Sequence, residues 1–195
     1  MNGRTILIAV SAVTLLGALY YLNVPSSSNF HMSGKTALED GVPGLEFRLS
    51  QISRNPPSLL VTLKNNNPSS PFTILRWNTP LDPQAANLGL FKLVDEETGK
   101  EIPTDGLKVN RLMPPSEEDF VTVAPGTEEA HEIVMNKPWL PEKKPAKYKV
   151  TISGKFSGIW DKYGGDLQSS EREAYFDSPF SGKPFTSNEV SMRVE

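Results

Sequence analysis

Short segments in which apolar and polar residues alternate recur along most of this chain, with turn-forming residues between them. The alternation is clearest in residues 45–49 and 147–155. A period of two places the apolar side chains on one face of a strand, which is typical of antiparallel sheets with one buried face. The chain contains 17 Pro and 14 Gly, which supply turns between the segments. This pattern predicts an all-β domain, an immunoglobulin-like antiparallel β-sandwich.

The segments that read as strands are residues 45–49, 58–64, 72–77, 88–94, 100–103, 106–113, 119–123, 129–135, 147–155 and 188–194. Residues 158–184 lack such a pattern and contain five aromatic side chains. A loop of that length inside a compact domain is either functional or a partly disordered insertion, and both alternatives stay open.

An uncharged run of 18 residues, 5–22, lies near the N-terminus. A helix of that length spans roughly 27 Å, close to the hydrocarbon thickness of a bilayer. Arg4 precedes the run, and the next Lys, Arg, Asp or Glu is Lys35. The positive-inside tendency therefore predicts a cytoplasmic N-terminus and a C-terminal domain on the lumenal or extracellular side.

The run allows two interpretations. It is longer than a usual signal-peptide apolar region and ends in Tyr20 and Tyr21, as a membrane anchor does. Small residues up to Ser28 also offer a cleavage site, which would make the protein secreted. The predicted organisation is residues 1–4 cytoplasmic, 5–22 signal-anchor or signal peptide, 23–42 flexible tether and 43–195 β-sandwich domain.

Composition and motifs exclude several classes of function. The net charge is −3 without a basic block, so nucleic acid is not an expected partner. Cysteine is absent, which excludes a disulfide partner, thiol catalysis and thiolate metal sites. His131-Glu132 begins a zinc-peptidase-like motif, but Met135 occupies the position of the second histidine. We therefore expect no metal, no cofactor and no catalytic residue.

Residues 58–126 resemble a known domain. The most specific segments are 75–82, LRWNTPLD, and 119–126, DFVTVAPG. They are similar to the N-terminal propeptide domain of the deuterolysin-like and peptidyl-lysine metalloendopeptidases (aspzincins) of fungi and some bacteria. The resemblance implies a β-sandwich module that assists folding and restrains the protease. The family's zinc-binding His-Glu-x-x-His motif and distal aspartate have no counterpart here, so no catalytic residue carries over.

The sequence thus predicts a non-enzymatic module that binds a protein client, such as a secreted metalloprotease, and contacts the membrane through residues 5–22. Two alternatives remain: an accessory protein or enzyme of a fungal-type biosynthetic pathway acting on a small molecule in the endomembrane system, and a structural surface protein. The candidate binding surface consists of four aromatic residues: Trp77, Trp160, Tyr163 and Tyr175. For Trp77 a structural role is the alternative, since at a strand end its ring can bury a large apolar surface. Aromatic side chains are enriched among residues that dominate binding energy.

Overall fold

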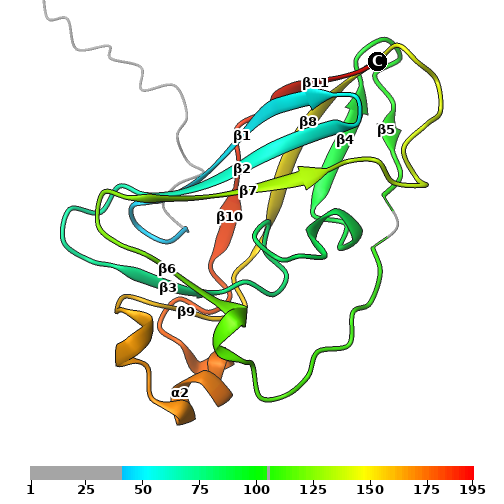
Figure 1. Cartoon of the computed structure of the whole chain (residues 1–195). Coiled ribbons are helices and arrows are strands. Elements are labelled where there is room, and N and C mark those ends of the chain that lie inside the picture. The colour runs from blue at the N-terminus through cyan, green and yellow to red at the C-terminus, as the bar shows by residue number, and fades with distance from the viewer. Residues whose placement is uncertain (1–40, 105) are drawn as a thin grey trace, which may run out of the picture. The chain divides into compact units, whose positions relative to one another are not determined.

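A computed structural model describes residues 41–104 and 106–195, which form three antiparallel sheets (Figure 1). The first sheet joins β1 (Leu45–Arg54), β2 (Pro57–Asn65) and β7 (Glu128–Val134). The second joins β10 (Pro184–Thr186), β8 (Ala146–Lys155), β4 (Phe91–Asp95) and β5 (Glu101–Ile102), with β11 (Val190–Val194) also on β8. The third is smaller and joins β6 (Phe120–Val123), β3 (Phe72–Leu75) and β9 (Ile159–Trp160).

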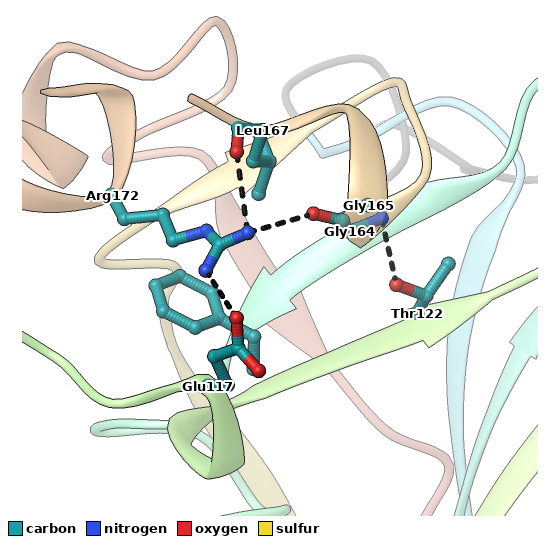
Figure 2. A pocket seen from close by; sticks show the side chains of 7 residues that line it. Glu117, Thr122, Gly164, Gly165, Leu167 and Arg172 are labelled. Atoms are coloured by element: carbon teal, nitrogen blue, oxygen red, sulfur yellow. Dashed lines mark hydrogen bonds and ion pairs between the residues drawn. The ribbon is translucent and has the colours of Figure 1, made fainter. Parts of the chain in front are cut away.

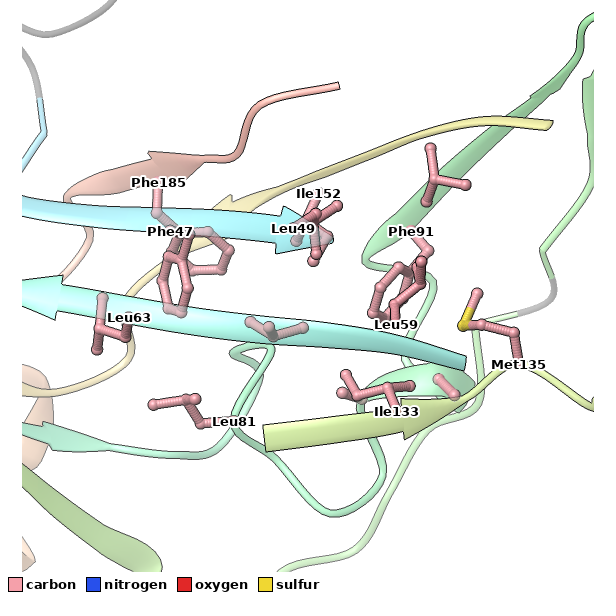
Figure 3. Close-up of a cluster of buried hydrophobic side chains, with 14 of the residues drawn as sticks. Phe47, Leu49, Leu59, Leu63, Leu81, Phe91, Ile133, Met135, Ile152 and Phe185 are labelled. Atoms are coloured by element: carbon pink, nitrogen blue, oxygen red, sulfur yellow. The ribbon is translucent and has the colours of Figure 1, made fainter. Parts of the chain in front are cut away.

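The first two sheets form a sandwich whose core follows the alternation in the sequence. In β8, Tyr148, Val150 and Ile152 are buried, whereas Lys147 and Lys149 are exposed. Figure 3 shows the corresponding side chains of β1, β2, β4 and β7 meeting between the sheets. The prediction of an all-β sandwich is therefore confirmed for the described residues, and the pattern arises because only one face of each strand leaves water.

Two side-chain amides close one side of the sandwich, where β1 and β11 lie beside each other (Figure 1). Asn188 accepts a hydrogen bond from the Leu49 amide at 2.8 Å and donates one to the Leu49 carbonyl at 3.1 Å. Gln51 makes the same pair of bonds with the backbone of Arg193, at 2.9 and 2.6 Å. The Asn188 amide thus satisfies backbone groups at the edge of β1, and the Gln51 amide satisfies those of β11, which would otherwise be free.

The connection between β3 and β4 fills space beside the core. It contains a 3₁₀ turn, η1 (Ala85–Asn87), and its side chains Leu81 and Ala85 belong to the main hydrophobic cluster. Val42, at the start of the described chain, also packs in this cluster. The core is therefore sealed by loop residues as well as by strands.

Several predicted strand boundaries were wrong. Residues 106–113 form no strand, because their only backbone hydrogen bond to another described residue runs from the Leu107 amide to the Asn87 carbonyl, at 2.8 Å. Alternation alone does not make a strand without a neighbouring strand to pair with. The predicted strand 88–94 begins only at Phe91, since Gly89 adopts a positive φ of 70° in the preceding turn.

Residues 158–184 fold into short elements rather than a structureless insertion. They comprise β9, the 3₁₀ turns η3 (Gly164–Asp166) and η4 (Tyr175–Asp177), and the helix α2 (Ser169–Glu173). In Figure 1 these elements lie against the third sheet, near η2 (Glu117–Asp119). The segment is therefore an ordered part of the domain and not a partly disordered insertion.

The predicted anchor or signal segment, residues 5–22, lies outside the described residues, as does the predicted tether up to residue 40. Within residues 41–104 and 106–195, no helix has the length and apolar character needed to cross a membrane.

Candidate functional site

Three of the four aromatic residues expected at a binding surface are buried together. Trp77, Trp160 and Tyr175 are at most 7% exposed and form a second hydrophobic cluster with Leu75 and Leu167. The rings of Trp77 and Tyr175 pack edge to face with centroids 5.8 Å apart. We call this group the aromatic cluster; it packs residues 158–184 against the third sheet.

Tyr163, the fourth predicted surface residue, stays outside this cluster and is 48% exposed. Trp160 also borders a cavity of about 300 Å³ beside α2, whose lining includes neither Tyr163 nor Tyr175. The structure therefore does not bring all four aromatic residues together at one surface.

Polar groups surround the indole of Trp77 on two sides. Its Nε1 donates a hydrogen bond to Oδ1 of Asp119 at 2.7 Å. The guanidinium of Arg111 lies over the ring, 5.6 Å from its centroid, in a cation–π arrangement. Burial raises the pKa of Asp119, but hydrogen bonds from Ser116 and Trp77 outweigh burial and hold this pKa below its usual value.

Asp82 is the buried charge at the centre of this region. Its side chain is 0% exposed and forms an ion pair with Arg111. It also accepts hydrogen bonds from the backbone amides of Asn78, at 3.0 Å, and Gln84, at 2.9 Å. Burial of a carboxylate is costly unless it is paired and hydrogen-bonded, and these three contacts meet that requirement.

The role of Arg111 escaped sequence reasoning. It lies 29 positions from Asp82, inside a segment predicted to be a strand, and no local motif connects the two residues. Turns form at residues 77–78, where Asn78 has a positive φ of 58°, and at residues 83–84. The 75–82 motif therefore supplies a buried hydrogen-bond acceptor, Asp82, and its charged partner, Arg111, comes from a distant loop.

The loop that carries Arg111 exposes apolar side chains. Leu107, Leu112 and Met113 are 60%, 90% and 58% exposed. Residues 106–115, which we call the outer segment, run from the end of β5 towards η2 along the outside of the sandwich (Figure 1). Arg111 fixes the middle of the outer segment, and buried Pro115 lies at its end.

A small pocket lies between β6 and residues 164–172, and Figure 2 shows it from close by. Its volume is about 220 Å³. We call it the Arg172 pocket; its lining consists of Glu117, Phe120, Thr122, Gly164, Gly165, Leu167 and Arg172. Nη1 of Arg172 donates to Oε1 of Glu117 at 3.0 Å, and the Gly164 amide donates to Oγ1 of Thr122 at 3.2 Å.

The truncated zinc motif lies on a strand, as its sequence predicts. His131 is part of β7 and pairs opposite Val61, while Ile133 and Met135 on the same face are buried. Among the residues that the structure describes, no group of three or more His, Asp and Glu side chains is arranged to hold a metal ion.

Comparison with known proteins agrees with this architecture. The immunoglobulin-like domain family matches residues 44–194. A protein of the fungus Arthroderma benhamiae, described as an uncharacterized secreted protein, is 32% identical over 140 residues, which cover 70% of this chain and 69% of the relative. The family match spans the sandwich and the elements beside it, so this chain belongs to the immunoglobulin-like domain family.

Proposed function

We propose that this protein is a non-enzymatic, extracytoplasmic module that binds a protein client through its outer segment. The observation that carries the proposal is the exposure of Leu107, Leu112 and Met113 on one anchored loop. Clustered exposed apolar side chains on a soluble domain mark interaction sites, whereas scattered ones do not.

The outer segment is suited to protein recognition by its backbone as well. From residue 108 to residue 115 it makes no backbone hydrogen bond to any other described residue. The amides of residues 108–113 and the carbonyls of residues 108–115 can therefore pair with a client. Full burial of a Leu or Met side chain on binding would contribute about 1.5–3 kcal/mol.

Anchoring reduces the cost of binding. Arg111 is held by buried Asp82 and by the face of Trp77, one residue before Leu112. At the other end, the side chain of Asp119 accepts hydrogen bonds from the amide and the hydroxyl of Ser116, each at 2.8 Å. A segment fixed on both sides loses less conformational entropy when a partner immobilises it.

The resemblance of residues 58–126 to protease propeptides favours a secreted metalloprotease as the client. The outer segment lies within this resembling region, between the 75–82 and 119–126 motifs. The A. benhamiae relative is described as secreted, which supports a location outside the cytoplasm for this domain. Residues 5–22 would then serve as its signal peptide or its membrane anchor.

A binding measurement tests the proposal. The full chain is immobilised, and a purified mature deuterolysin-type metalloendopeptidase is passed over it in biolayer interferometry. We expect binding that weakens at least tenfold in the double variant Leu112→Ser, Met113→Ser. Ile52→Ser is the matched control, because Ile52 is 50% exposed but lies on β1.

Equal affinity of all three proteins would refute the role of the outer segment. Absence of any binding would refute the protease client. Substrate turnover by the purified chain alone, lost on changing a few of its side chains, would refute the non-enzymatic assignment.

A further inference from the structure

We propose that the Arg172 pocket binds a carboxylate attached to a single apolar group, with Arg172 as its receptor and Glu117 as an internal competitor. This site includes no residue of the outer segment. The inference is independent of the proposed function and stands on its own contacts.

Arg172 is held in one orientation by the backbone around it. Its Nη2 donates to the carbonyls of Gly164, at 3.3 Å, and Leu167, at 3.2 Å. Its side chain is only 23% exposed. These two bonds fix the guanidinium plane and leave Nη1 facing Glu117, as Figure 2 shows. A guanidinium fixed in this way is ready to bind a carboxylate, for which its geometry is suited.

Glu117 holds that position only weakly. Its side chain is 87% exposed, so its ion pair with Arg172 is surrounded by water. Exposed ion pairs contribute little free energy, because solvent screens them and holding two long side chains costs entropy. An incoming carboxylate can therefore replace that of Glu117, which then turns into solvent.

The rest of the pocket determines what the carboxylate is attached to. Phe120 and Leu167 supply its apolar surface, and Phe120 is supported by Trp160, with ring centroids 5.9 Å apart. Gly164 and Gly165 add no side chain to the lining. An apolar wall with one oriented charged group is the usual construction of a small-ligand site.

The size of the pocket limits the ligand. A volume of about 220 Å³ admits one residue-sized group rather than a large molecule. The expected ligand chemistry is a carboxylate next to a Leu-sized side chain. Either a free N-acyl amino acid or the C-terminal residue of a polypeptide supplies it, and capture of chain-terminal carboxylates is a recurring mode of peptide recognition.

The test is a calorimetric and NMR titration of the full chain with three probes. These are N-acetyl-leucine, an acetylated pentapeptide ending in leucine, and the same pentapeptide with an amidated C-terminus. We expect the free-acid pentapeptide to bind and to shift the signals of Phe120 and Gly165, and the amide to bind at least tenfold more weakly. Comparable binding of N-acetyl-leucine would show that a free N-acyl amino acid is a sufficient ligand. If N-acetyl-leucine does not bind and the free-acid pentapeptide does, the site recognises the C-termini of polypeptides.

Two variants separate binding from folding. Arg172→Met should abolish binding, but it also removes bonds that hold η3. Glu117→Gln leaves Arg172 in place and removes the competing charge, so affinity should rise about two- to fivefold. Glu101→Gln, in the exposed Lys92–Glu101 pair, is the matched control and should leave affinity unchanged. Equal binding of acid and amide, no binding of either acid probe, or weaker binding by Glu117→Gln would overturn the proposal.

Discussion

Replacing Asp82 by Asn should destabilise the protein severely, although the two side chains have nearly the same shape. The Asp82 carboxylate is 0% exposed and receives Arg111 and two backbone amides. Asn has only one acceptor oxygen, so its amide nitrogen would face one of these donors. Arg111, whose side chain is 21% exposed, would also lose its counter-charge. Breaking a buried pair in this way costs about 3–5 kcal/mol.

Such a loss is a large part of the roughly 5–15 kcal/mol that stabilises a domain. It should lower Tm by about 6–20 °C for a domain of this size. The assay is urea unfolding followed by tryptophan fluorescence, together with a thermal melt, on the wild type, Asp82→Asn, Arg111→Met and the double variant. Because the two residues contact each other, the double variant should be more stable than the sum of the single losses implies, by about 1–3 kcal/mol.

Two results would refute this reasoning. The first is a loss below about 0.5 kcal/mol for Asp82→Asn, which falls in the range of ordinary surface substitutions. The second is strict additivity of the two single variants, which would mean that the ion pair contributes nothing to the folded state.

Three further predictions concern the rest of the fold. Asn188→Ala removes both hydrogen bonds to the Leu49 backbone and should cost about 1–3 kcal/mol in urea unfolding. Gly154→Ala places a Cβ 2.5 Å from Cζ of Phe185 and should cost about 1–3 kcal/mol by overpacking. Asp119 has a lowered pKa when folded, so its contribution to stability is present above its unfolded value of 3.8 and is lost as pH falls through the folded pKa. Asp119→Asn should therefore lose less stability than the wild type between pH 5 and about pH 2.

Each of these has a control. Gly165→Ala meets no atom within 4 Å and should leave the urea midpoint nearly unchanged. Asn87→Ala removes an exposed side-chain bond to Gln84 and should cost less than Asn188→Ala. Equal effects of Gly154→Ala and Gly165→Ala, or of the two Asn variants, would contradict the packing and hydrogen-bond arguments. If the stability of Asp119→Asn fell with pH as steeply as that of the wild type, the prediction for Asp119 would be contradicted.

The sandwich was predictable because its strands follow a local rule. In β2 and β8 every second side chain is buried, and this period is visible in the sequence before any contact is known. The same rule failed for residues 106–113, where alternation is present but no strand lies alongside. Strand pairing depends on distant partners, and a single sequence does not reveal them.

The candidate site was less predictable for the same reason. Trp77 was conspicuous as a large aromatic residue at a strand end, but its burial depends on residues 158–184, which fold over it. Sequence alone also did not connect Arg111 with Asp82 or Arg172 with Glu117, which lie 29 and 55 positions apart. The sequence signal for the outer segment was a group of apolar residues close to two prolines. The interpretation of residues 106–113 as a strand hid this signal.

We propose that the outer segment is the surface by which this module binds its client. Hydrogen–deuterium exchange of the full chain, alone and with a purified deuterolysin-type metalloendopeptidase, tests it most directly. We expect the amides of residues 108–113 to exchange rapidly in the free protein and to become protected in the complex, while β8 is unchanged. Protection of β7, the last strand of the first sheet in the described chain, instead of residues 108–113, or no protection anywhere, would contradict this proposal.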